Sequence, residues 1–250
     1  MQKHVLLATG AGRGIGAAVC RHFSTLGYEV LVHYRSSAES ALLLVEEISA
    51  NCRALSFQAD VSQPEQVEAL FQFCRENFGR LDVLVNTASY SSSRGWKVEL
   101  EDIDWTEWQK TIDVDLKGTM LCSHAAHPIM KAQGSGAIIN FSSSAALYGD
   151  VPTYLYTAAK SAIVGITRTL SRAYAPEVRV NCIAPGSVAT DWIQKWKLTE
   201  EDLKEITRET PLKRIARPEE IAALIAYLAS PEGSFITGQT LAVDGGILML

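Results

Sequence analysis

The architecture of this chain of 250 residues follows from one segment, Val5-Leu6-Leu7-Ala8-Thr9-Gly10-Ala11-Gly12-Arg13-Gly14-Ile15-Gly16. The apolar run Val5–Thr9 has the length of a strand that is buried on both faces, and a segment with helical periodicity follows at Gly14–Leu26. Glycines between a strand and a helix allow a tight turn and a close approach to a pyrophosphate, which the helix N-terminus stabilises. The segment therefore predicts a nucleotide-binding turn. A glycine turn that serves only packing is the alternative.

Strands and helices alternate along most of the remaining chain. Further apolar runs of strand length occur at Val30–Tyr34, Ala54–Ala59, Val83–Asn86, Gly136–Ser142, Val178–Ala184 and Thr240–Val243. Segments with helical periodicity lie between them, at Ser40–Ala50, Pro64–Phe78, Leu116–Ala132, Tyr154–Tyr174 and Pro218–Leu228. This alternation predicts an α/β fold, a doubly wound parallel sheet of about seven strands with helices on both faces. Because the chain has no Pro/Gly/Ser-rich linker, repeat or low-complexity segment, we predict a single domain over residues 1–250.

Composition argues against several classes of protein. A net charge of −5 and the lack of a Lys/Arg run argue against a surface for nucleic acid or anionic membrane. The apolar run after Met1–His4 is too short for a signal peptide or a membrane span. The five cysteines are scattered without a C-x-x-C pair, which predicts buried thiols instead of disulfides or a metal site. We therefore expect a cytoplasmic protein that binds neither nucleic acid, nor membrane, nor metal.

The second strand indicates which dinucleotide the turn would bind. The turn itself has the spacing G-x-x-x-G-x-G, at Gly10, Gly14 and Gly16. Enzymes that use NAD usually place an acidic residue after the second strand, where it binds the ribose 2′-hydroxyl. Here that strand ends in His33-Tyr34-Arg35-Ser36-Ser37, without an acid. Arg35 and Arg13 could instead hold a 2′-phosphate by charge-assisted hydrogen bonds. The sequence therefore favours NADP(H), with two merely solvated arginines as the alternative.

Polar residues follow the other predicted strands as well. Asp60-Val61 ends the third strand, Asn86-Thr87-Ala88-Ser89 the fourth, and Ser142-Ser143-Ser144 the fifth. Since the carboxyl ends of parallel strands meet at one edge, where open α/β sheets bind ligands, these residues are candidates for a site. The carboxylate of Asp60 could accept from an adenine amino group. The hydroxyl of Ser143 could bind a substrate carbonyl, although three serines could equally form a turn.

A tyrosine and a lysine stand four residues apart in the predicted helix Tyr154–Tyr174. Residues at this spacing lie on one helix face, so Tyr156 and Lys160 present a phenol and an ammonium side by side. A neighbouring cation stabilises a phenolate, which makes the pair an acid–base device for a carbonyl or an alcohol. Taken alone, the spacing is common on helices and has no functional meaning.

In this order and spacing, the residues resemble the short-chain dehydrogenase/reductase family, in its 3-oxoacyl-carrier-protein-reductase-like branch. The resemblance covers essentially the whole chain and rests on Thr9–Gly16, Asp60-Val61, Asn86, Ser143, Tyr156–Lys160, Pro185-Gly186, Thr237-Gly238-Gln239 and Val243–Gly246. It implies a Rossmann fold and an NADP(H)-dependent oxidoreductase that acts on CH–OH groups.

The resemblance also implies roles for individual residues. Tyr156 would donate or accept the proton, Lys160 would lower the phenol's pKa and hold the nicotinamide ribose, and Ser143 would orient the carbonyl. The implied cofactor contacts are Gly10, Arg13, Gly14, Ile15, Gly16, Arg35, Ser36, Asp60, Val61, Asn86, Ala88, Tyr156, Lys160, Val188 and Thr190. Residues 191–209 look like a mobile substrate lid. Members are commonly tetramers, so we expect a homotetramer or a homodimer.

Three departures from the family pattern stand near the implied site. Asp115 occupies the fourth catalytic position, where the family has an Asn whose main-chain carbonyl holds a relay water, and its charge would raise the pKa of Lys160. Ser89 replaces the last glycine of an Asn-Asn-Ala-Gly motif. Residues 90–96 form an insertion at the mouth of the site. With Trp96 from the insertion, the lid residues Trp192 and Trp196 would give the substrate pocket an aromatic rim, unless these tryptophans pack at a subunit interface.

The substrate class stays open at this point. The stretches Ala132–Gly136 and Ala173–Glu177, where the branch would offer arginines to an acidic carrier protein, have none, and a net acidic protein steers such a partner poorly. We therefore favour a free small-molecule ketone or alcohol over a carrier-bound 3-oxoacyl chain. A catalytically silent NADP-binding protein is the alternative from another class, which Asp115 and Ser89 motivate.

Overall fold

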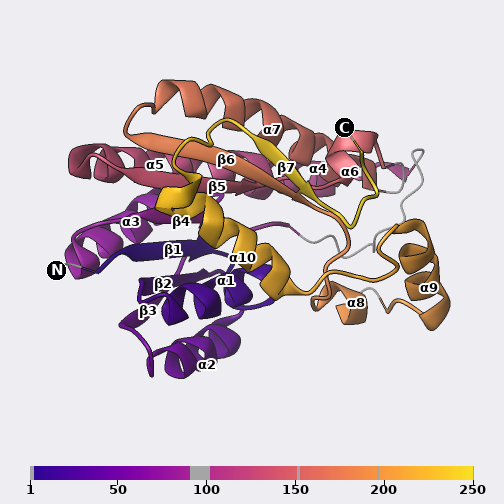
Figure 1. The fold of residues 1–250 in the computed structure, drawn as a ribbon, viewed down its shortest axis with the longest axis horizontal. Helices are drawn as coiled ribbons and strands as arrows, with labels where there is room; N and C mark the ends of the chain where they lie inside the picture. The colour runs from indigo at the N-terminus through magenta and orange to yellow at the C-terminus, as the bar shows by residue number, and fades with distance from the viewer. Residues whose placement is uncertain (1–2, 91–101, 151–152, 196, 250) are drawn as a thin grey trace.

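In the part of the chain that the structure describes, seven parallel strands form one sheet in the order β3-β2-β1-β4-β5-β6-β7 (Figure 1). The strands are β1 (Val5–Thr9), β2 (Glu29–Tyr34), β3 (Ala54–Gln58), β4 (Val83–Asn86), β5 (Gly136–Phe141), β6 (Val178–Pro185) and β7 (Thr240–Val243). This computed structural model describes residues 3–90, 102–150, 153–195 and 197–249. The predicted fold is confirmed, and each predicted strand lies within one residue of its observed bounds.

Helices cover both faces of the sheet, which makes it doubly wound (Figure 1). One face carries α1 (Gly14–Thr25), α2 (Ala38–Ile48) and α10 (Pro218–Ala229). The other face carries α3 (Pro64–Phe78), α5 (Gly118–Gln133) and α7 (Tyr154–Ala173). Shorter helices are α4 (Trp105–Thr111), α6 (Ala145–Tyr148), α8 (Trp192–Lys195), α9 (Glu200–Glu209) and a 3₁₀ turn at Pro231–Gly233. No described helix has the length and apolar character needed to cross a membrane.

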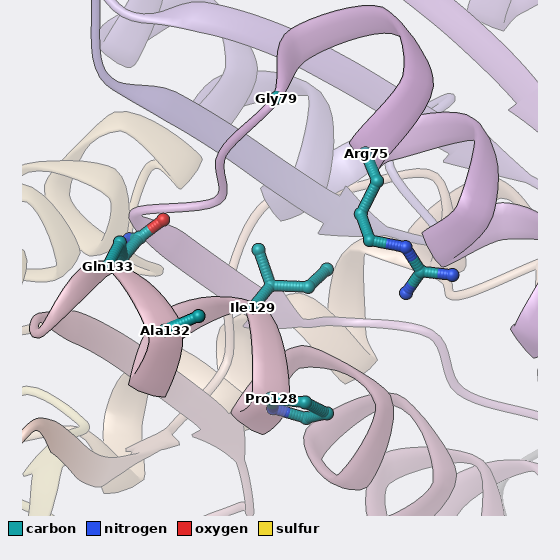
Figure 2. Close-up of a pocket in the computed structure, with 6 residues that line it drawn as sticks. All are labelled: Arg75, Gly79, Pro128, Ile129, Ala132 and Gln133. Carbon is teal, nitrogen blue, oxygen red and sulfur yellow. The ribbon is translucent and has the colours of Figure 1, made fainter.

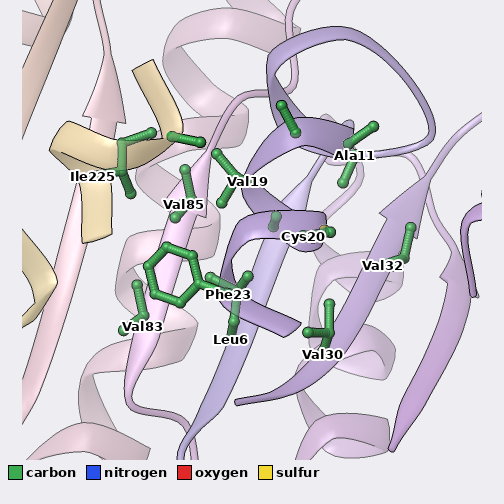
Figure 3. Packing of buried hydrophobic residues seen from close by; sticks show 14 of the residues in the cluster. Leu6, Ala11, Val19, Cys20, Phe23, Val30, Val32, Val83, Val85 and Ile225 are labelled. Atoms are coloured by element: carbon green, nitrogen blue, oxygen red, sulfur yellow. The ribbon is translucent and has the colours of Figure 1, made fainter. Parts of the chain in front are cut away.

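Alternate residues of each central strand supply the two cores. Leu6 and Ala8 of β1 face the α1 side, whereas Val5 and Leu7 face the α3 side, and all four are fully buried. A strand covered on both faces must be apolar at every position, which explains the continuous apolar runs in the sequence. Phe23 of α1 packs against β1, β4 and α10 (Figure 3). Burial of such a side chain stabilises the fold by about 1.5–3 kcal/mol.

The segment before α5 differs from the sequence-based expectation. The helix predicted at Leu116–Ala132 is preceded by a π-helix, Ile112–Lys117, which has one extra residue in its turn and continues into α5. Hydrophobic periodicity cannot distinguish a π-helical turn from an α-helical one, so the sequence did not reveal it. The described cysteines, by contrast, are all free and buried, as predicted.

Candidate active site

The carboxyl edge of the sheet brings the predicted site residues together because neighbouring strands end in register. Thr9 of β1 pairs with Asn86 of β4, which pairs with Asn140 of β5. The glycine turn after β1, the segment after β4 and the serines after β5 therefore start from one row across the sheet. At this edge, Gly14 of the turn also approaches Thr190, whose methyl carbon would lie 3.4 Å from a Cβ added to the glycine.

The glycine turn packs so closely that two of its positions exclude a side chain. A Cβ on Gly10 would lie 2.8 Å from the Cα of Ala88, and the φ of Gly10 is +63°. A Cβ on Gly16 would lie 2.7 Å from the Cα of Ala11. Both distances are shorter than contact between carbon atoms allows. The glycines are therefore required by the protein's own packing, whether or not the turn binds a pyrophosphate.

A buried histidine, which the sequence reading did not single out, fixes this turn to two strands. The Nδ1 atom of His33 in β2 accepts a hydrogen bond from the main-chain N–H of Gly10 (3.0 Å), and its Nε2–H donates to the carbonyl of Ala59 (2.9 Å). These bonds require the neutral ring. Burial lowers the pKa of His33 to about 4.

This histidine makes stability depend on acid in a predictable direction. Between pH 6.5 and about 4 the ring is protonated in the unfolded chain but not in the folded protein, so stability falls as the pH falls, by about 3 kcal/mol in total. We expect urea unfolding of the His33→Asn variant to lose this part of the acid dependence. The His124→Asn variant, at an exposed position on α5, should retain it. If the free energy of unfolding depends on pH equally in the His33→Asn variant and the wild type, His33 is not the source of the acid dependence.

Both arginines predicted to hold a 2′-phosphate lie exposed at this edge, and each faces a carboxylate. Arg13 Nη1 lies 2.8 Å from Asp191 Oδ2, at the start of the predicted lid, and Arg35 Nη1 lies 3.8 Å from Asp60 Oδ2. Exposed pairs of this kind contribute at most about 1 kcal/mol, so an incoming phosphate can compete for either guanidinium. Asp60 Oδ1 is bonded to the main-chain N–H (2.9 Å) and hydroxyl (2.7 Å) of Ser62, which fix the carboxylate at the end of β3.

Arg35 and Asp60 also line a surface hollow of about 420 Å³. The other lining residues are Ser62, Gln63, Tyr90, Lys110, Asp113 and Val114. Lys110 adds a second cation to this hollow, and its ammonium lies 3.4 Å from Glu107 Oε1 and 5.9 Å from the centre of the Tyr90 ring. The sequence reading missed Lys110 because it comes from α4, a helix that was not predicted.

Two of the predicted cofactor residues turn their side chains into the interior. The amide of Asn86 donates to Asn140 Oδ1 (2.9 Å) and Ser123 Oγ (3.1 Å), and Asn140 donates in turn to Thr167 Oγ1 (3.0 Å). The amide NH2 of Asn86 therefore belongs to a buried polar network, and a cofactor contact of Asn86 stays a prediction. The side chain of Val61 belongs to the core on the α3 side, which leaves only its main chain for a ligand.

The predicted catalytic pair lies on one face of α7, as its spacing indicates. The ammonium of Lys160 is 5.3 Å from the centre of the Tyr156 ring, and Lys160 is almost fully buried. The main-chain oxygen of Lys160 accepts a hydrogen bond from the hydroxyl of Ser142 (2.8 Å), which ties α7 to the end of β5. The hydroxyl of the neighbouring residue, Ser143, lowers the pKa of the Tyr156 phenol, and it accepts a hydrogen bond from the main-chain N–H of Ala145 (3.2 Å). The three predicted catalytic side chains thus form one cluster.

Asp115 adds a carboxylate to this cluster from the π-helix. Its Oδ2 lies 3.0 Å from the ammonium of Lys160, and Asp115 is fully buried. The same oxygen accepts a hydrogen bond from the hydroxyl of Ser89 (2.6 Å), and Oδ1 accepts one from the main-chain N–H of Tyr90 (2.7 Å). Its main-chain oxygen accepts from the hydroxyl of Thr119 (2.6 Å). The side chain of Asp115 is therefore the group that meets the lysine.

The electrostatic balance of the cluster keeps both groups of the pair protonated. Burial lowers the pKa of Lys160, but Asp115 and Tyr156 raise it by more, so the lysine remains an ammonium. Burial raises the pKa of Tyr156, and although Lys160 lowers it, the net pKa lies above its ordinary value. Lys160 thus lowers the pKa of the phenol, as expected, but desolvation by burial outweighs the charge of the lysine. A protonated phenol is the form that donates to a carbonyl.

Two short helices, α8 and α9, form the predicted lid and lie beyond the carboxyl edge (Figure 1). The indole Nε1–H of Trp192 donates to the carbonyl of Val188, which anchors the start of α8 to the loop after β6. The aromatic rim stays a prediction for Trp192. Trp96 and Trp196, with most of the insertion at residues 90–96, lie outside the described residues.

A second hollow, of about 400 Å³, lies between α3 and α5, away from this cluster (Figure 2). It is lined by Arg75, Gly79, Pro128, Ile129, Ala132 and Gln133. The amide of Gln133 donates to the carbonyl of Leu81, just before β4 (2.7 Å), so the hollow belongs to the amino edge of the sheet. None of the predicted site residues lines it.

Known proteins resemble this chain along almost its whole length. The model of a family described as enoyl-(acyl carrier protein) reductase matches residues 10–248. A 3-oxoacyl-[acyl-carrier-protein] reductase of Synechocystis is 39% identical over 249 residues, which cover 98% of this chain and 97% of that protein. The short-chain reductase protein NovJ of Streptomyces niveus is 39% identical over 98% of this chain and 94% of its own.

Solved structures of short-chain dehydrogenases/reductases have the same fold as this chain. A short-chain dehydrogenase/reductase from Brucella melitensis superposes with a TM-score of 0.89 at 32% sequence identity, covering 99% of this chain and 97% of that one. The likeness therefore includes the glycine turn, the strand ends and the helix with Tyr156 and Lys160. Sequence, sheet order and these relatives together show that the chain belongs to the short-chain dehydrogenase/reductase family of oxidoreductases.

Proposed function

We propose that this protein is an NADP(H)-dependent oxidoreductase that interconverts a ketone and a secondary alcohol. The cluster of Ser143, Tyr156 and Lys160 carries the proposal, because it unites a hydrogen-bonding hydroxyl, a protonated phenol and an ammonium at the carboxyl edge. Membership of an oxidoreductase family supports the reaction class.

Each group of the cluster has a separate task in the reduction. Ser143 donates a hydrogen bond to the carbonyl oxygen of the substrate and holds it beside Tyr156. Tyr156 gives its proton to that oxygen as the carbonyl carbon is reduced. The ammonium of Lys160 stabilises the phenolate that remains, by an interaction that the buried surroundings strengthen. In the oxidation direction the phenolate takes the proton from the alcohol.

The residues present fit a phosphorylated dinucleotide, which supplies the hydride when it is bound. The glycine turn and the start of α1 would hold the pyrophosphate. Arg35 and Arg13 would bind the 2′-phosphate, which would replace the carboxylates of Asp60 and Asp191 as the partners of the two guanidinium groups. No acidic residue stands where NAD enzymes bind the ribose 2′-hydroxyl, since β2 is followed by Arg35 and Ser36.

The Arg35→Asp variant tests the choice of cofactor. We expect its Kd for NADPH to rise about 100-fold, because a charge-assisted contact is lost and a repulsive charge is added, while its Kd for NADH changes little. Quenching of protein fluorescence would measure both constants. The Arg75→Asp variant makes the same charge change at an exposed position on α3 and should bind both cofactors as the wild type does. Unchanged NADPH affinity in Arg35→Asp would refute the role of Arg35.

We propose a free small-molecule ketone or alcohol as the substrate. The stretches before β5 and after α7 offer no arginine to an acidic carrier protein, and the net charge of the protein is −5. A carrier-bound 3-oxoacyl chain is the second candidate, which the names of several relatives favour. A panel of ketones, acetoacetyl thioesters and acetoacetyl carrier protein, with NADPH oxidation followed by absorbance, separates the two.

The outcomes of this panel are distinct. Turnover of free ketones supports the first candidate, and turnover only of carrier-linked thioesters replaces it with the second. Tight NADPH binding without turnover of any compound would indicate a catalytically silent NADP-binding protein.

The same preparation should be a homotetramer or homodimer by light scattering, since exposed apolar side chains such as Phe235, Leu212 and Met249 suit a subunit interface.

A further inference from the structure

Asp115, Ser89 and the start of the insertion, the three departures from the family pattern, converge on one point in the structure. The carboxylate of Asp115 contacts Lys160, the hydroxyl of Ser89 and the main-chain N–H of Tyr90, the first residue of the insertion. An asparagine at position 115 and a glycine at position 89 could not make the same arrangement, because glycine has no hydroxyl and a neutral amide does not exchange protons as a carboxylate does. The departures therefore form a single device.

We infer that Asp115 and Ser89 are a side-chain proton relay that connects the buried Lys160 with solvent. The inference rests on the proposed function, in which Tyr156 loses a proton in every reduction and must regain one before the next. Lys160 and Asp115 are buried, so this proton needs a path. Ser89 is exposed, and it is the group of this chain that brings the path to the surface.

The geometry of the carboxylate suits transfer through a single atom. Oδ2 of Asp115 lies 3.0 Å from the Lys160 ammonium and 2.6 Å from the Ser89 hydroxyl, so donor and acceptor of the proton share one oxygen. Oδ1 is held by the main-chain N–H of Tyr90 (2.7 Å), which prevents the carboxylate from rotating away. The main-chain oxygen of Asp115 accepts from Thr119, on the following helix, and takes no part in the route.

The protons balance over one turnover. Lys160 releases one proton toward the phenolate of Tyr156, and Asp115 passes the proton of the Ser89 hydroxyl to the lysine amine. Ser89 takes a proton from hydronium or from a buffer acid. At the end Lys160 is again an ammonium, Asp115 a carboxylate and Ser89 a hydroxyl, and one proton from solvent has replaced the one given to the substrate. The other titratable group that acts on Lys160 is the thiol of Cys182 in β6, and burial raises its pKa to about 11, which keeps it neutral.

The Ser89→Ala variant tests the relay against a merely structural hydrogen bond. In the first turnover Tyr156 uses its own proton, so the rate of a single turnover measured by stopped flow should equal that of the wild type. In the steady state kcat should fall about tenfold, less than for loss of a direct proton donor, because water can partly replace the hydroxyl. Because kcat/KM reports only the steps up to the reduction itself, it should not change, and KM should fall together with kcat. The Ser89→Thr variant, which retains a hydroxyl, should restore kcat, and small buffer acids should accelerate Ser89→Ala but not the wild type.

The controls keep this test separate from that of the proposed function. Wild-type turnover establishes the function first, and the Ser89 variants then probe only the route of the proton. Ser161→Ala removes an exposed hydroxyl of α7 that bonds only to carbonyl oxygens, and it should behave as the wild type. Wild-type steady-state rates in Ser89→Ala, or equal losses in the first and later turnovers, would overturn the relay.

A titration that does not depend on catalysis tests whether Asp115 acts on Lys160 and Tyr156, the buried end of the relay. The Asp115→Asn variant removes the carboxylate that raises the pKa of Tyr156, so ultraviolet titration of the cofactor-free protein should show this phenol ionising at lower pH than in the wild type. The Tyr156→Phe variant identifies its signal. An unchanged titration in Asp115→Asn would show that the carboxylate does not act on the catalytic pair, and would overturn the inference.

Discussion

Replacement of Tyr156 by phenylalanine should lower kcat for ketone reduction by about 10³-fold, with little change in the affinity for NADPH. The variant removes only the hydroxyl oxygen that donates the proton, and general acid catalysis typically contributes 10²–10⁴-fold. The ring stays in place beside Lys160, so the fold should be unaffected. Steady-state kinetics with NADPH and a ketone identified by the panel would measure the loss.

The matched control is Tyr227→Phe, which removes the hydroxyl of a half-exposed tyrosine on α10. It should retain full activity. A Tyr156→Phe variant with more than a tenth of the wild-type kcat would exclude the phenol as the proton donor. A variant that also lost NADPH binding would show that the hydroxyl acts mainly in holding the cofactor.

Replacement of Lys160 by methionine should both abolish activity and destabilise the fold. The change leaves the carboxylate of Asp115 buried without its cation, and removal of one partner from a buried ion pair typically costs about 3–5 kcal/mol. For a chain of this size the Tm should fall by roughly 6–20 °C. Calorimetry or circular dichroism would measure the shift, and Lys131→Met, at an exposed position of α5, should leave Tm almost unchanged.

A double variant separates the two effects of the lysine. Lys160→Met combined with Asp115→Asn has no isolated buried charge, so it should recover most of the lost stability without recovering activity. If the single variant melts as the wild type does, the ion pair does not exist in solution. If the double variant is less stable than the single one, the carboxylate is stabilised by Ser89 and Tyr90 without the lysine.

The sequence predicted the scaffold well because the scaffold depends on local patterns. Each predicted strand was found, since a strand covered on both faces must be apolar throughout and is easy to recognise. The pairing of Tyr156 and Lys160 follows from the geometry of any α-helix. By contrast, α4 and the π-helix before α5 were not predicted, because no periodicity distinguishes them.

What the sequence by itself determined is therefore the parallel sheet, the glycine turn and the position of the predicted catalytic residues at the carboxyl edge. Only the tertiary structure decided how these residues behave. It turned Asn86 into the interior, raised the pKa of Tyr156 by desolvation, and placed Asp115 between Lys160 and Ser89. The physical reason is distance along the chain: contacts among residues 89, 115 and 160 depend on how three separate elements pack, and burial sets the strength of each charge. A local pattern of residues predicts neither these long-range contacts nor the degree of burial.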